Sequence, residues 1–531
     1  MRQPAPSERA GSHIQGPPAG AVGLLTRTTV TGAPRTSRHR FMAALRLDGV
    51  MLGAAVVIGT VARTVDLGEV GLNSDEAVYA GQAASLAGNP HFTELFPVVR
   101  AHPLMFQVLI SAFYRTGIPE LPGRYGAAAF GVGTIVATYL AGRLLYRPRV
   151  GAIAALLLAV MPYHVVVSRQ VLLDGPMTFF TTLALVCLAA LGRSGSPRWL
   201  VGAAASLGLA VLTKESALVL LGSMFVLVAL VPRLGRPRGH LLAAIGTGAA
   251  LVLAYPLVTA MAGGARTGQS YLLWQLTRRP NHGFAFYLTA VAPAIGVLVL
   301  GLVVVGILLR RSRWQEVALI AWVVVPLVFF EVWPVKGFPY LVMLTPALAL
   351  LAARPLGWLA EAAAGSRLRA AGASAALVAV LLTLAVPTTR AVTSPTSSGL
   401  AGAGGSPGGR EAGLWVAGNL PVGARLMTIG PSMANILQYY SGRAALGLSV
   451  SPNPVHRNPV YQPIRNPDAA LRDGEFQYVV WDAYSAARSP TFAARQLAMV
   501  AKFDGRVVHV ELARFQGRAA QPVVVIYEVH Q

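Results

Sequence analysis

Residues 71–80 lie just beyond the first long apolar run, and they read Gly71-Leu72-Asn73-Ser74-Asp75-Glu76-Ala77-Val78-Tyr79-Ala80. The stretch holds two adjacent carboxylates, Asp75 and Glu76, in a chain with few acidic residues. Acidic side chains so close to a membrane are costly unless they face water, a partner or a substrate. We therefore expect these two residues to mark a functional site at a membrane surface.

The composition indicates a membrane protein that crosses the bilayer many times. Of the 531 residues, 54% are hydrophobic and only 12% are charged, whereas soluble domains carry about 25% charged residues. The net charge is +23, from 44 Lys and Arg against 21 Asp and Glu. The arginines cluster between apolar runs rather than on one polar domain, which favours cytoplasmic loops over a nucleic-acid surface. The single cysteine, Cys187, excludes an intrachain disulfide and argues against a thiolate metal site.

A membrane-spanning helix needs about 20 mostly apolar residues, and on this basis the sequence predicts about 11 of them. The first is interpreted as an uncleaved signal anchor, because it begins late and is long. Residues 104–117 are short and carry polar groups, so we expect a helix lying at the membrane interface there. The predicted spans are 42–64, 124–145, 150–167, 175–192, 199–213, 216–232, 241–262, 284–309, 316–333, 339–357 and 371–388.

The distribution of arginines predicts the orientation of these spans, because cytoplasmic loops carry an excess of Lys and Arg. Clusters of arginine follow every second predicted span, for example at 143–149, 233–238 and 310–313. The loops between them, including 65–123 and 263–283, are then external. The protein is predicted to lie in the cytoplasmic (plasma) membrane. Its N-terminus is expected in the cytoplasm and its C-terminus outside the cell membrane.

The chain is predicted to divide into four parts. Residues 1–40 are interpreted as a disordered basic cytoplasmic tail, 41–390 as the membrane domain with its first external loop at 65–123, and 391–410 as a Ser/Gly/Pro linker. Residues 411–531 predict a small extracytoplasmic α/β domain. Its expected strands are 425–429, 477–481, 507–511 and 523–527, with helices at 432–440 and 492–501.

The remaining polar residues of the membrane domain gather on the predicted external face, at the ends of different helices. Each also has a simpler explanation: Asp75 and Asp174 are good helix caps, Lys214 can form a loop-tip pair with Glu215, and Lys336 can snorkel to the interface. Independent caps have no reason to share one face, so we interpret the set as a site. Its members are Asp75, Glu76, His102, Arg169, Asp174, Lys214 and Lys336.

Several of these residues stand in motifs whose order resembles that of the GT-C membrane glycosyltransferases. The motifs are Asp75-Glu76 after the first span, His102-Pro103-Leu104, Arg169 through Asp174-Gly175-Pro176, and Leu212-Thr213-Lys214-Glu215. The nearest branch is similar to protein O-mannosyltransferases and lipid A aminoarabinose transferases (glycosyltransferase family 39), over about residues 42–350. Two departures are Leu104, where the family often has a second proline, and Lys336-Gly337-Phe338-Pro339-Tyr340, which lacks one expected cation.

The resemblance implies a GT-C fold and transfer of a sugar from a polyprenyl-phosphate carrier outside the cytoplasmic membrane. By the same resemblance, Asp75 matches the catalytic acid of the first external loop and Asp174 the second acid. Lys214 and Lys336 match cations near the lipid phosphate. The implied partners are a polyprenyl-phosphate sugar, membrane lipid and an envelope glycan, lipid or protein as acceptor, with no nucleic acid.

Elementary chemistry supports the same assignment. Nucleotide sugars are cytoplasmic, so an outward-facing transferase needs a membrane-carried donor whose phosphate meets Lys or Arg near the surface. Arg169, Lys214, Lys336 and His102 are expected to bind that phosphate, and Asp75 to accept the acceptor's proton, with Glu76 or Asp174 orienting the reactants. One base without a covalent nucleophile predicts inversion at the anomeric carbon. A divalent cation is compatible with Asp75, Glu76 and His102, although their spacing is no metal-ligand signature.

Two other classes of function remain open at this point. Transporters and lipid flippases place charges near the bilayer midplane or in repeated halves, whereas here the charges lie at span ends and no repeat is evident. A non-enzymatic membrane protein whose outer domain binds an envelope polymer is the second alternative.

Overall fold

The structure is a computed structural model of the 531-residue chain. It describes residues 35–98, 102–231, 238–261, 271, 273–309, 314–363, 365–393, 406–513 and 519–530. The predictions for the tail at 1–40 and the linker at 391–410 therefore lie largely outside the described residues. The chain forms two units, Met1–Arg46 and Leu47–Gln531, and the second contains everything that follows.

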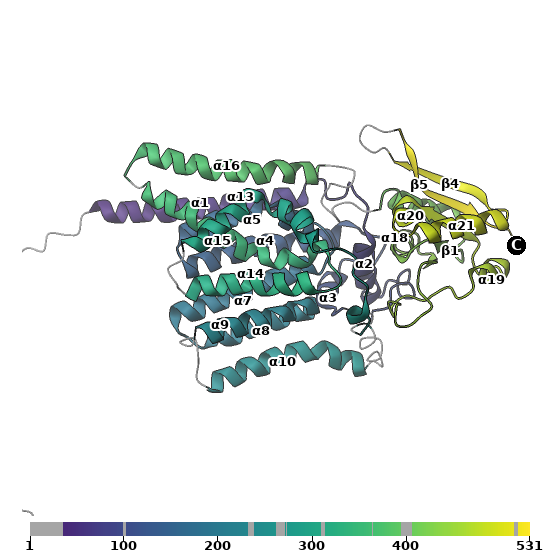
Figure 1. The fold of residues 1–531 in the computed structure, drawn as a ribbon, viewed down its shortest axis with the longest axis horizontal. Helices are drawn as coiled ribbons and strands as arrows, with labels where there is room; N and C mark the ends of the chain where they lie inside the picture. Colours follow the sequence, from purple (N-terminus) through teal and green to yellow (C-terminus); the bar gives the residue numbers. More distant parts are fainter. Residues whose placement is uncertain are drawn as a thin grey trace, which may run out of the picture. The chain divides into compact units, whose positions relative to one another are not determined.

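Among the described residues, 7 helices are long and apolar enough to cross a membrane, and a bent helix pair makes up to 8. Three shorter apolar helices, α5, α8 and the pair η1–α9, lie between them. Each predicted span falls on one of these helical segments, which confirms a polytopic helical membrane protein (Figure 1). The segments are α1 (Arg35–Thr64), α4 (Leu121–Leu145), α5 (Pro148–Ala159), α7 (Asp174–Ser194), α8 (Arg198–Thr213), η1 (Glu215–Leu218), α9 (Val219–Leu230), α10 (Arg238–Met261), η3 (Tyr287–Val291), α12 (Ala292–Ile295), α13 (Val297–Leu308), α14 (Trp314–Val332), η4 (Phe338–Leu344), α15 (Thr345–Ala362) and α16 (Arg367–Val392).

Two predicted spans are interrupted, one ahead of a proline and the other at a glycine with positive φ. The run at 150–167 divides into α5 and α6 (Pro162–Val167), because the proline nitrogen has no hydrogen to donate to the preceding turn. The run at 284–309 bends by 87° between α12 and α13, at Gly296, whose φ of 103° is open to glycine and strained for other residues. Each break divides a predicted span into two shorter helices.

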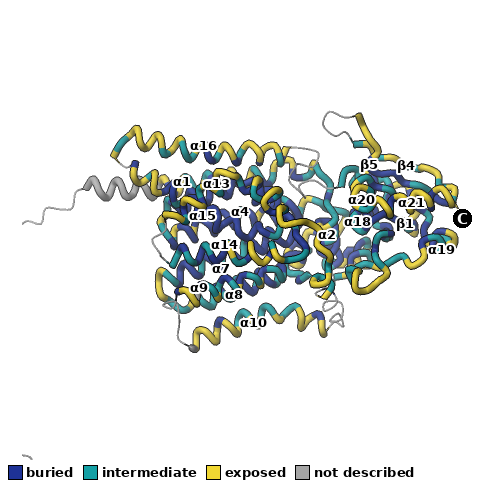
Figure 2. Tube along the Cα trace, in the orientation of Figure 1, coloured by how far each residue is buried: buried dark blue, intermediate teal, exposed yellow. Residues whose placement is uncertain are grey.

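Burial separates central helices from peripheral ones. The span formed by η4 and α15 has 89% of its apolar window buried, whereas those of α10 and α16 have 6% and 11% (Figure 2). An apolar membrane helix that the rest of the protein does not cover faces lipid tails. The helices α10 and α16 therefore face the bilayer, and α15 is the packed centre.

The segment between α1 and α4 carries two short helices, α2 (Ser74–Leu86) and α3 (Met105–Ser111). The 7 residues of α3 rise about 10 Å at 1.5 Å per residue, a third of the bilayer's apolar thickness. A spanning helix is thus excluded at 104–117, as the sequence predicts. The segment between α1 and α4 therefore contains two short helices, and Asp75 lies in the first turn of α2.

The C-terminal part is a small domain with a mixed sheet of 5 strands in the order β2-β1-β3-β5-β4. The strands β2, β1 and β3 are parallel, and β5 pairs antiparallel with both β3 and β4. Strand β2 was not predicted, because Ala444–Gly447 lacks β-branched and aromatic residues. The strands are β1 (Arg425–Thr428), β2 (Ala444–Gly447), β3 (Tyr478–Asp482), β4 (Arg506–Ala513) and β5 (Gln521–Glu528).

Helices cover both faces of this sheet because its inner strands alternate between two apolar cores. Leu426 and Val480 pack with α17 (Gly409–Asn419) and α18 (Pro431–Ser441). Their chain neighbours Met427 and Val479 pack on the other face with α19 (Pro467–Arg472) and α21 (Pro490–Lys502). Successive side chains of a strand point to opposite faces, which explains why both layers of helices are retained. The short helix α20 (Ala483–Arg488) follows β3 directly.

Helix α18 of this domain contacts the beginning of α2. The hydroxyl of Tyr440 accepts a hydrogen bond from the backbone nitrogen of Leu72 at 2.8 Å. The amide of Asn435 donates to the hydroxyl of Ser74 at 3.0 Å. The C-terminal domain is therefore attached to the stretch that holds Asp75.

Candidate active site

Helix α2 begins with a reciprocal cap that sets the position of Asp75. The side chain of Asn73 accepts hydrogen bonds from the backbone nitrogens of Asp75 and Glu76, each at 3.0 Å. The Glu76 carboxylate in turn accepts from the backbone nitrogen of Asn73 at 3.1 Å. Such a capping box satisfies backbone donors that have no partner within the helix. The cap of α2 is therefore Asn73 and not Asp75, so capping does not occupy the Asp75 side chain.

Glu76 is buried and forms an ion pair with Arg124 of α4, with both of its oxygens 2.9 Å from the guanidinium. It also accepts from the backbone nitrogen of Val171 at 3.0 Å. Arg124 donates further bonds to the backbone carbonyls of Leu67, Val70 and Gly71. Breaking such a buried pair costs several kcal/mol, so the pair holds α2 against α4 and against the start of α7.

Asp75 differs from Glu76 in being accessible. Its side chain is exposed, and among the described residues no hydrogen bond reaches its carboxylate oxygens. The surrounding protein nevertheless raises the pKa of Asp75 by burial, opposed by Lys214 and His102 and reinforced by Asp174 and Glu76. Asp75 is thus free to meet a ligand, and four charged or ionisable groups act on it.

Asp174 and Lys214 form a buried pair beside this carboxylate. Asp174 is the first residue of α7, and both of its oxygens accept hydrogen bonds from the Lys214 ammonium at 2.8 Å. The ammonium also lies 4.9 Å from the ring centre of Tyr340. Lys214 stands where α8 ends and η1 begins, so a break in a helical hairpin presents it at this end of the domain.

His102 lies on the other side of Asp75 and is held by three groups. Its Nδ1 donates to the carboxylate of Glu215 at 2.9 Å, since a carboxylate can only accept. Its Nε2 is then the acceptor for the hydroxyl of Tyr271 at 3.3 Å, and its ring packs edge-on against Tyr79. The orientation of the imidazole is therefore fixed by these three contacts.

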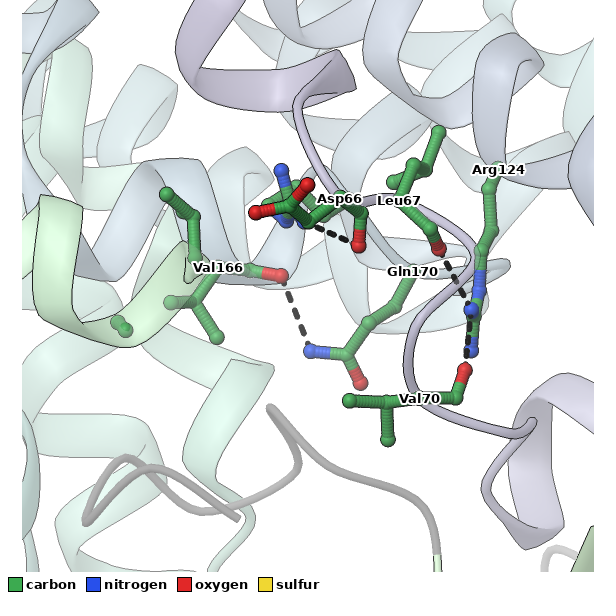
Figure 3. Close-up of a pocket in the computed structure, with 9 residues that line it drawn as sticks. Asp66, Leu67, Val70, Arg124, Val166 and Gln170 are labelled. Carbon is green, nitrogen blue, oxygen red and sulfur yellow. Dashed lines mark hydrogen bonds between the residues drawn. The ribbon is translucent and has the colours of Figure 1, made fainter. Parts of the chain in front are cut away.

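Arg169 is placed apart from this group. Its guanidinium donates to the backbone carbonyl of Ala62 at 3.0 Å and to that of Asp66 at 3.3 Å. It lines a cavity of about 30 Å³ shared with Arg124, Gln170 and Asp66 (Figure 3), a space for one or two water molecules. No described contact joins Arg169 to Asp75, and burial lowers the pKa of Arg169 to about 10, with Arg124 adding to the effect.

Lys336 also has its own partners. Its ammonium donates to the backbone carbonyls of Phe330 and Glu331 at the end of α14 and lies 3.4 Å from the Glu331 carboxylate. It stands 5.5 Å from the ring centre of Tyr287, which lies within electrostatic range of Asp174 and Tyr340. Lys336 therefore lies next to Tyr287 at the border of the site, and its ammonium is bound by the end of α14.

Three side chains of the site were not singled out from the sequence. Tyr340 and Tyr271 line it as described, and Arg278 acts electrostatically on both tyrosines. Arg278 lies in the loop at 263–283 that the arginine pattern predicts to be external, and that position is a signal for it. Tyr271 has no comparable sequence signal, because its role depends on a hydrogen bond to a histidine 169 residues away.

A resident metal ion does not fit these residues. Among the described residues, no three His, Cys, Asp or Glu side chains gather as a metal site. Asp174 already directs both oxygens at Lys214, and His102 directs Nδ1 at Glu215. The divalent cation considered from the sequence therefore enters no step below.

Comparisons with known proteins agree with this architecture. Residues 101–262 match the family described as dolichyl-phosphate-mannose-protein mannosyltransferase. The crystal structure of ArnT from Cupriavidus metallidurans in the apo state is similar at TM-score 0.63 and 17% identity, over 91% of this chain and 98% of that one. The same protein bound to undecaprenyl phosphate is similar at TM-score 0.62 and 16% identity, over 90% and 97%.

A more distant protein shares the fold as well. The apo oligosaccharyltransferase of Archaeoglobus fulgidus is similar at TM-score 0.56 and 15% identity, over 90% of this chain and 74% of that one. No curated protein sequence matches the chain. The expected GT-C fold is confirmed by these structures, and the family match lies on the segment that carries His102, Arg169, Asp174 and Lys214.

Proposed function

We propose that the chain is a GT-C membrane glycosyltransferase that moves a sugar from a polyprenyl-phosphate donor to an envelope acceptor on the outer face of the cytoplasmic membrane, a reading supported by the family match over residues 101–262 and by the shared fold. The observation that carries this proposal is the accessible Asp75 carboxylate, surrounded by Lys214, His102 and Asp174. A free base next to cations is what a sugar phosphate donor and a hydroxyl acceptor require. The undecaprenyl phosphate bound to ArnT supports a polyprenyl-phosphate donor here.

In the proposed reaction Asp75 removes the proton from the acceptor hydroxyl or amine as that group attacks the anomeric carbon. The new glycosidic bond forms while the bond from the anomeric carbon to the phosphate oxygen breaks. The bonding pair leaves with the polyprenyl phosphate, where negative charge grows in the transition state. Attack opposite the leaving phosphate inverts the anomeric configuration.

The cations of the site have unequal tasks in this proposal. The Lys214 ammonium is the cation that acts most strongly on Asp75 and is assigned the contact with the departing phosphate. The His102 imidazole has both nitrogens engaged, by Glu215 and by Tyr271, and so holds this side of the site in place. Asp174 orients Lys214 through its two 2.8 Å hydrogen bonds. Glu76 contributes by holding α2 through Arg124. Arg169 and Lys336 already donate to backbone carbonyls, so their charge attracts the donor phosphate from a longer range.

The orientation is part of the proposal. With the N-terminus in the cytoplasm, the Asp75 end of the helices and the C-terminal domain lie outside, where a lipid-linked sugar is the available activated donor. The lipid tail of the donor can lie against the exposed apolar faces of α10 and α16.

The decisive experiment uses the purified full-length protein in lipid nanodiscs with a panel of polyprenyl-phosphate sugars. We expect release of free polyprenyl phosphate from one donor, increased by an envelope extract from a deletion strain. Mass spectrometry of that strain's glycans and glycoproteins identifies the product that is missing. Absence of turnover with every donor, together with an unchanged envelope, would remove the transferase assignment.

A further inference from the structure

A second cavity, larger than the one of Figure 3, lies in the segment that follows Tyr271, the hydrogen-bond partner of His102. It has a volume of about 410 Å³, and it is lined by Trp274, Thr277, Arg278, Arg279 and His456. Four of these residues belong to the loop between α10 and η3, and His456 belongs to the C-terminal domain. Ligand pockets commonly measure about 300–1,000 Å³, so this space admits a small polar group such as a sugar unit.

Among the described residues that line the cavity, two are arginines and one is a histidine, and none has an aliphatic side chain. Among the described residues, neither Arg278 nor Arg279 forms an ion pair with a carboxylate. Arg278 instead lies over the Trp274 ring, 4.4 Å from its centre. Two arginines and a histidine without an acid suit a phosphate or carboxylate group. The only large apolar side chain among the described lining residues is Trp274, which suits the face of a sugar ring better than a long lipid tail.

The cavity is held in place from both sides. The hydroxyl of Thr277 lies 3.3 Å from the backbone carbonyl of Val455 of the C-terminal domain and slightly nearer to the carbonyls of Trp274 and Leu273, at 3.1 and 3.2 Å. The side chain of Asn281 exchanges hydrogen bonds with the backbone of Lys336 at 2.8 and 2.9 Å. The cavity therefore lies between residues 274–279 of the membrane domain and His456 of the C-terminal domain.

A chain of hydrogen bonds leads from this cavity to the Asp75 group. Arg278 donates to Gln275 at 3.1 Å, and Gln275 donates to the hydroxyl of Tyr271 at 2.6 Å. Tyr271 donates to His102, which donates to Glu215. All donors point in one direction, so the position of Arg278 and that of His102 are coupled. A group bound at Arg278 lies at the rim of the reaction site.

We propose that this cavity binds an acidic sugar unit of the acceptor, so that the acceptor of the reaction is an anionic envelope glycan. The proposal rests on the proposed function, because it names the acceptor of that transfer. The arginines and His456 bind the phosphate or carboxylate of the glycan, and Trp274 offers a flat face for its sugar ring. The hydroxyl to be glycosylated is thereby brought toward Asp75.

Binding is tested with defined probes on the full-length protein in nanodiscs, by titration calorimetry without any donor. The probes are a tetramer of galacturonic acid, a phosphorylated mannose oligosaccharide and neutral maltotetraose. We expect one or both acidic probes to bind at least about tenfold more tightly than maltotetraose, since charge-assisted hydrogen bonds are about twice as strong as neutral ones. The stronger acidic probe identifies carboxylate or phosphate as the recognised group.

Variants assign the binding to this cavity. Arg279→Gln and His456→Gln should each weaken the acidic probe, Arg279→Gln by about tenfold, and Arg279→Lys should weaken it less. The matched control is Arg506→Gln, which removes an exposed arginine of β4 outside the cavity. Equal binding of neutral and acidic probes, or equal losses in Arg279→Gln and Arg506→Gln, would overturn the proposal.

The two proposals fail separately. Asp75→Asn should bind the acidic probe as the wild type does, because Asp75 does not line the cavity. Donor turnover without acidic-glycan binding refutes the acceptor assignment and leaves the transferase standing. Acidic-glycan binding without donor turnover refutes the transferase and identifies the cavity as a glycan-binding site alone.

Discussion

Asp174 and Lys214 meet through two 2.8 Å hydrogen bonds, although 40 residues separate them in the chain. Both are buried at the end of the helices that also carries Asp75. A buried ammonium with a bidentate carboxylate keeps its charge and its direction. This pair therefore holds the Lys214 ammonium in a fixed position near the accessible Asp75 carboxylate, with Asp174 balancing its charge.

Asp75→Asn should lower sugar transfer by about 10²–10⁴-fold, the range of a general base. The asparagine keeps the size of the side chain but cannot accept the proton, and the Asn73 cap acts on the backbone. The measurement is release of polyprenyl phosphate by the purified variant. Glu94→Gln is the control, since Glu94 is an exposed acid of the same loop. Full activity of Asp75→Asn would exclude Asp75 as the base.

The pH profile should respond to Asp174. The surrounding protein raises the pKa of Asp75, with Asp174 adding to the rise and Lys214 opposing it. Activity therefore increases with pH as Asp75 ionises. In Asp174→Asn one negative charge is lost and Lys214 is no longer neutralised, so the pKa falls and the acid limb of kcat/KM should move to lower pH. If the acid limb stays in place or moves to higher pH, the ionisation of Asp75 does not determine it.

Arg124 and Glu76 should behave as a structural pair. Glu76→Ala and Arg124→Ala each leave one buried charge without its partner, at a cost of about 3–5 kcal/mol. The double variant removes both charges and should be more stable than the sum of the two losses allows. Thermal unfolding in detergent provides the measurement, with donor turnover at low temperature to follow the position of α2. Additive losses would contradict a direct pair.

Lys214 and Lys336 should differ in what they support. Lys214→Gln removes the ammonium nearest Asp75 and should lower kcat/KM for the donor by about 10–100-fold. Lys336→Gln removes a cation that binds the end of α14, so Tm should fall more clearly than kcat/KM. The comparison needs both Tm and donor kinetics for each variant. Equal losses of kcat/KM at equal Tm would assign Lys336 a direct contact with the phosphate.

Membrane orientation is tested with single cysteines in a Cys187→Ala background. Thr491→Cys lies on an exposed position of the C-terminal domain, and Ala362→Cys lies at the exposed end of α15. An impermeant thiol reagent added to intact cells should label the first variant at once and the second only after lysis. The reverse pattern would place the Asp75 group in the cytoplasm and remove the argument for a lipid-linked donor.

Much of the architecture follows from local sequence patterns. Runs of about 20 apolar residues specify membrane helices, and the short continuous runs of β-branched and aromatic residues in β3 and β5 are typical of strands covered on both faces. Proline at Pro162 and glycine at Gly296 interrupt two runs that the hydropathy pattern alone leaves continuous. Because these signals lie within a few neighbouring residues, the sequence determines helices, strands and the residue classes of a site.

The division of labour within the site depends on contacts between distant segments. Asp75 and Glu76 are neighbours of the same chemical type, yet one is accessible and the other is paired with Arg124 of α4. Likewise Lys214 faces Asp174, while Lys336 binds the end of α14. Burial and pairing depend on what the other helices bring near, so only the tertiary structure decides which charge stays free to react.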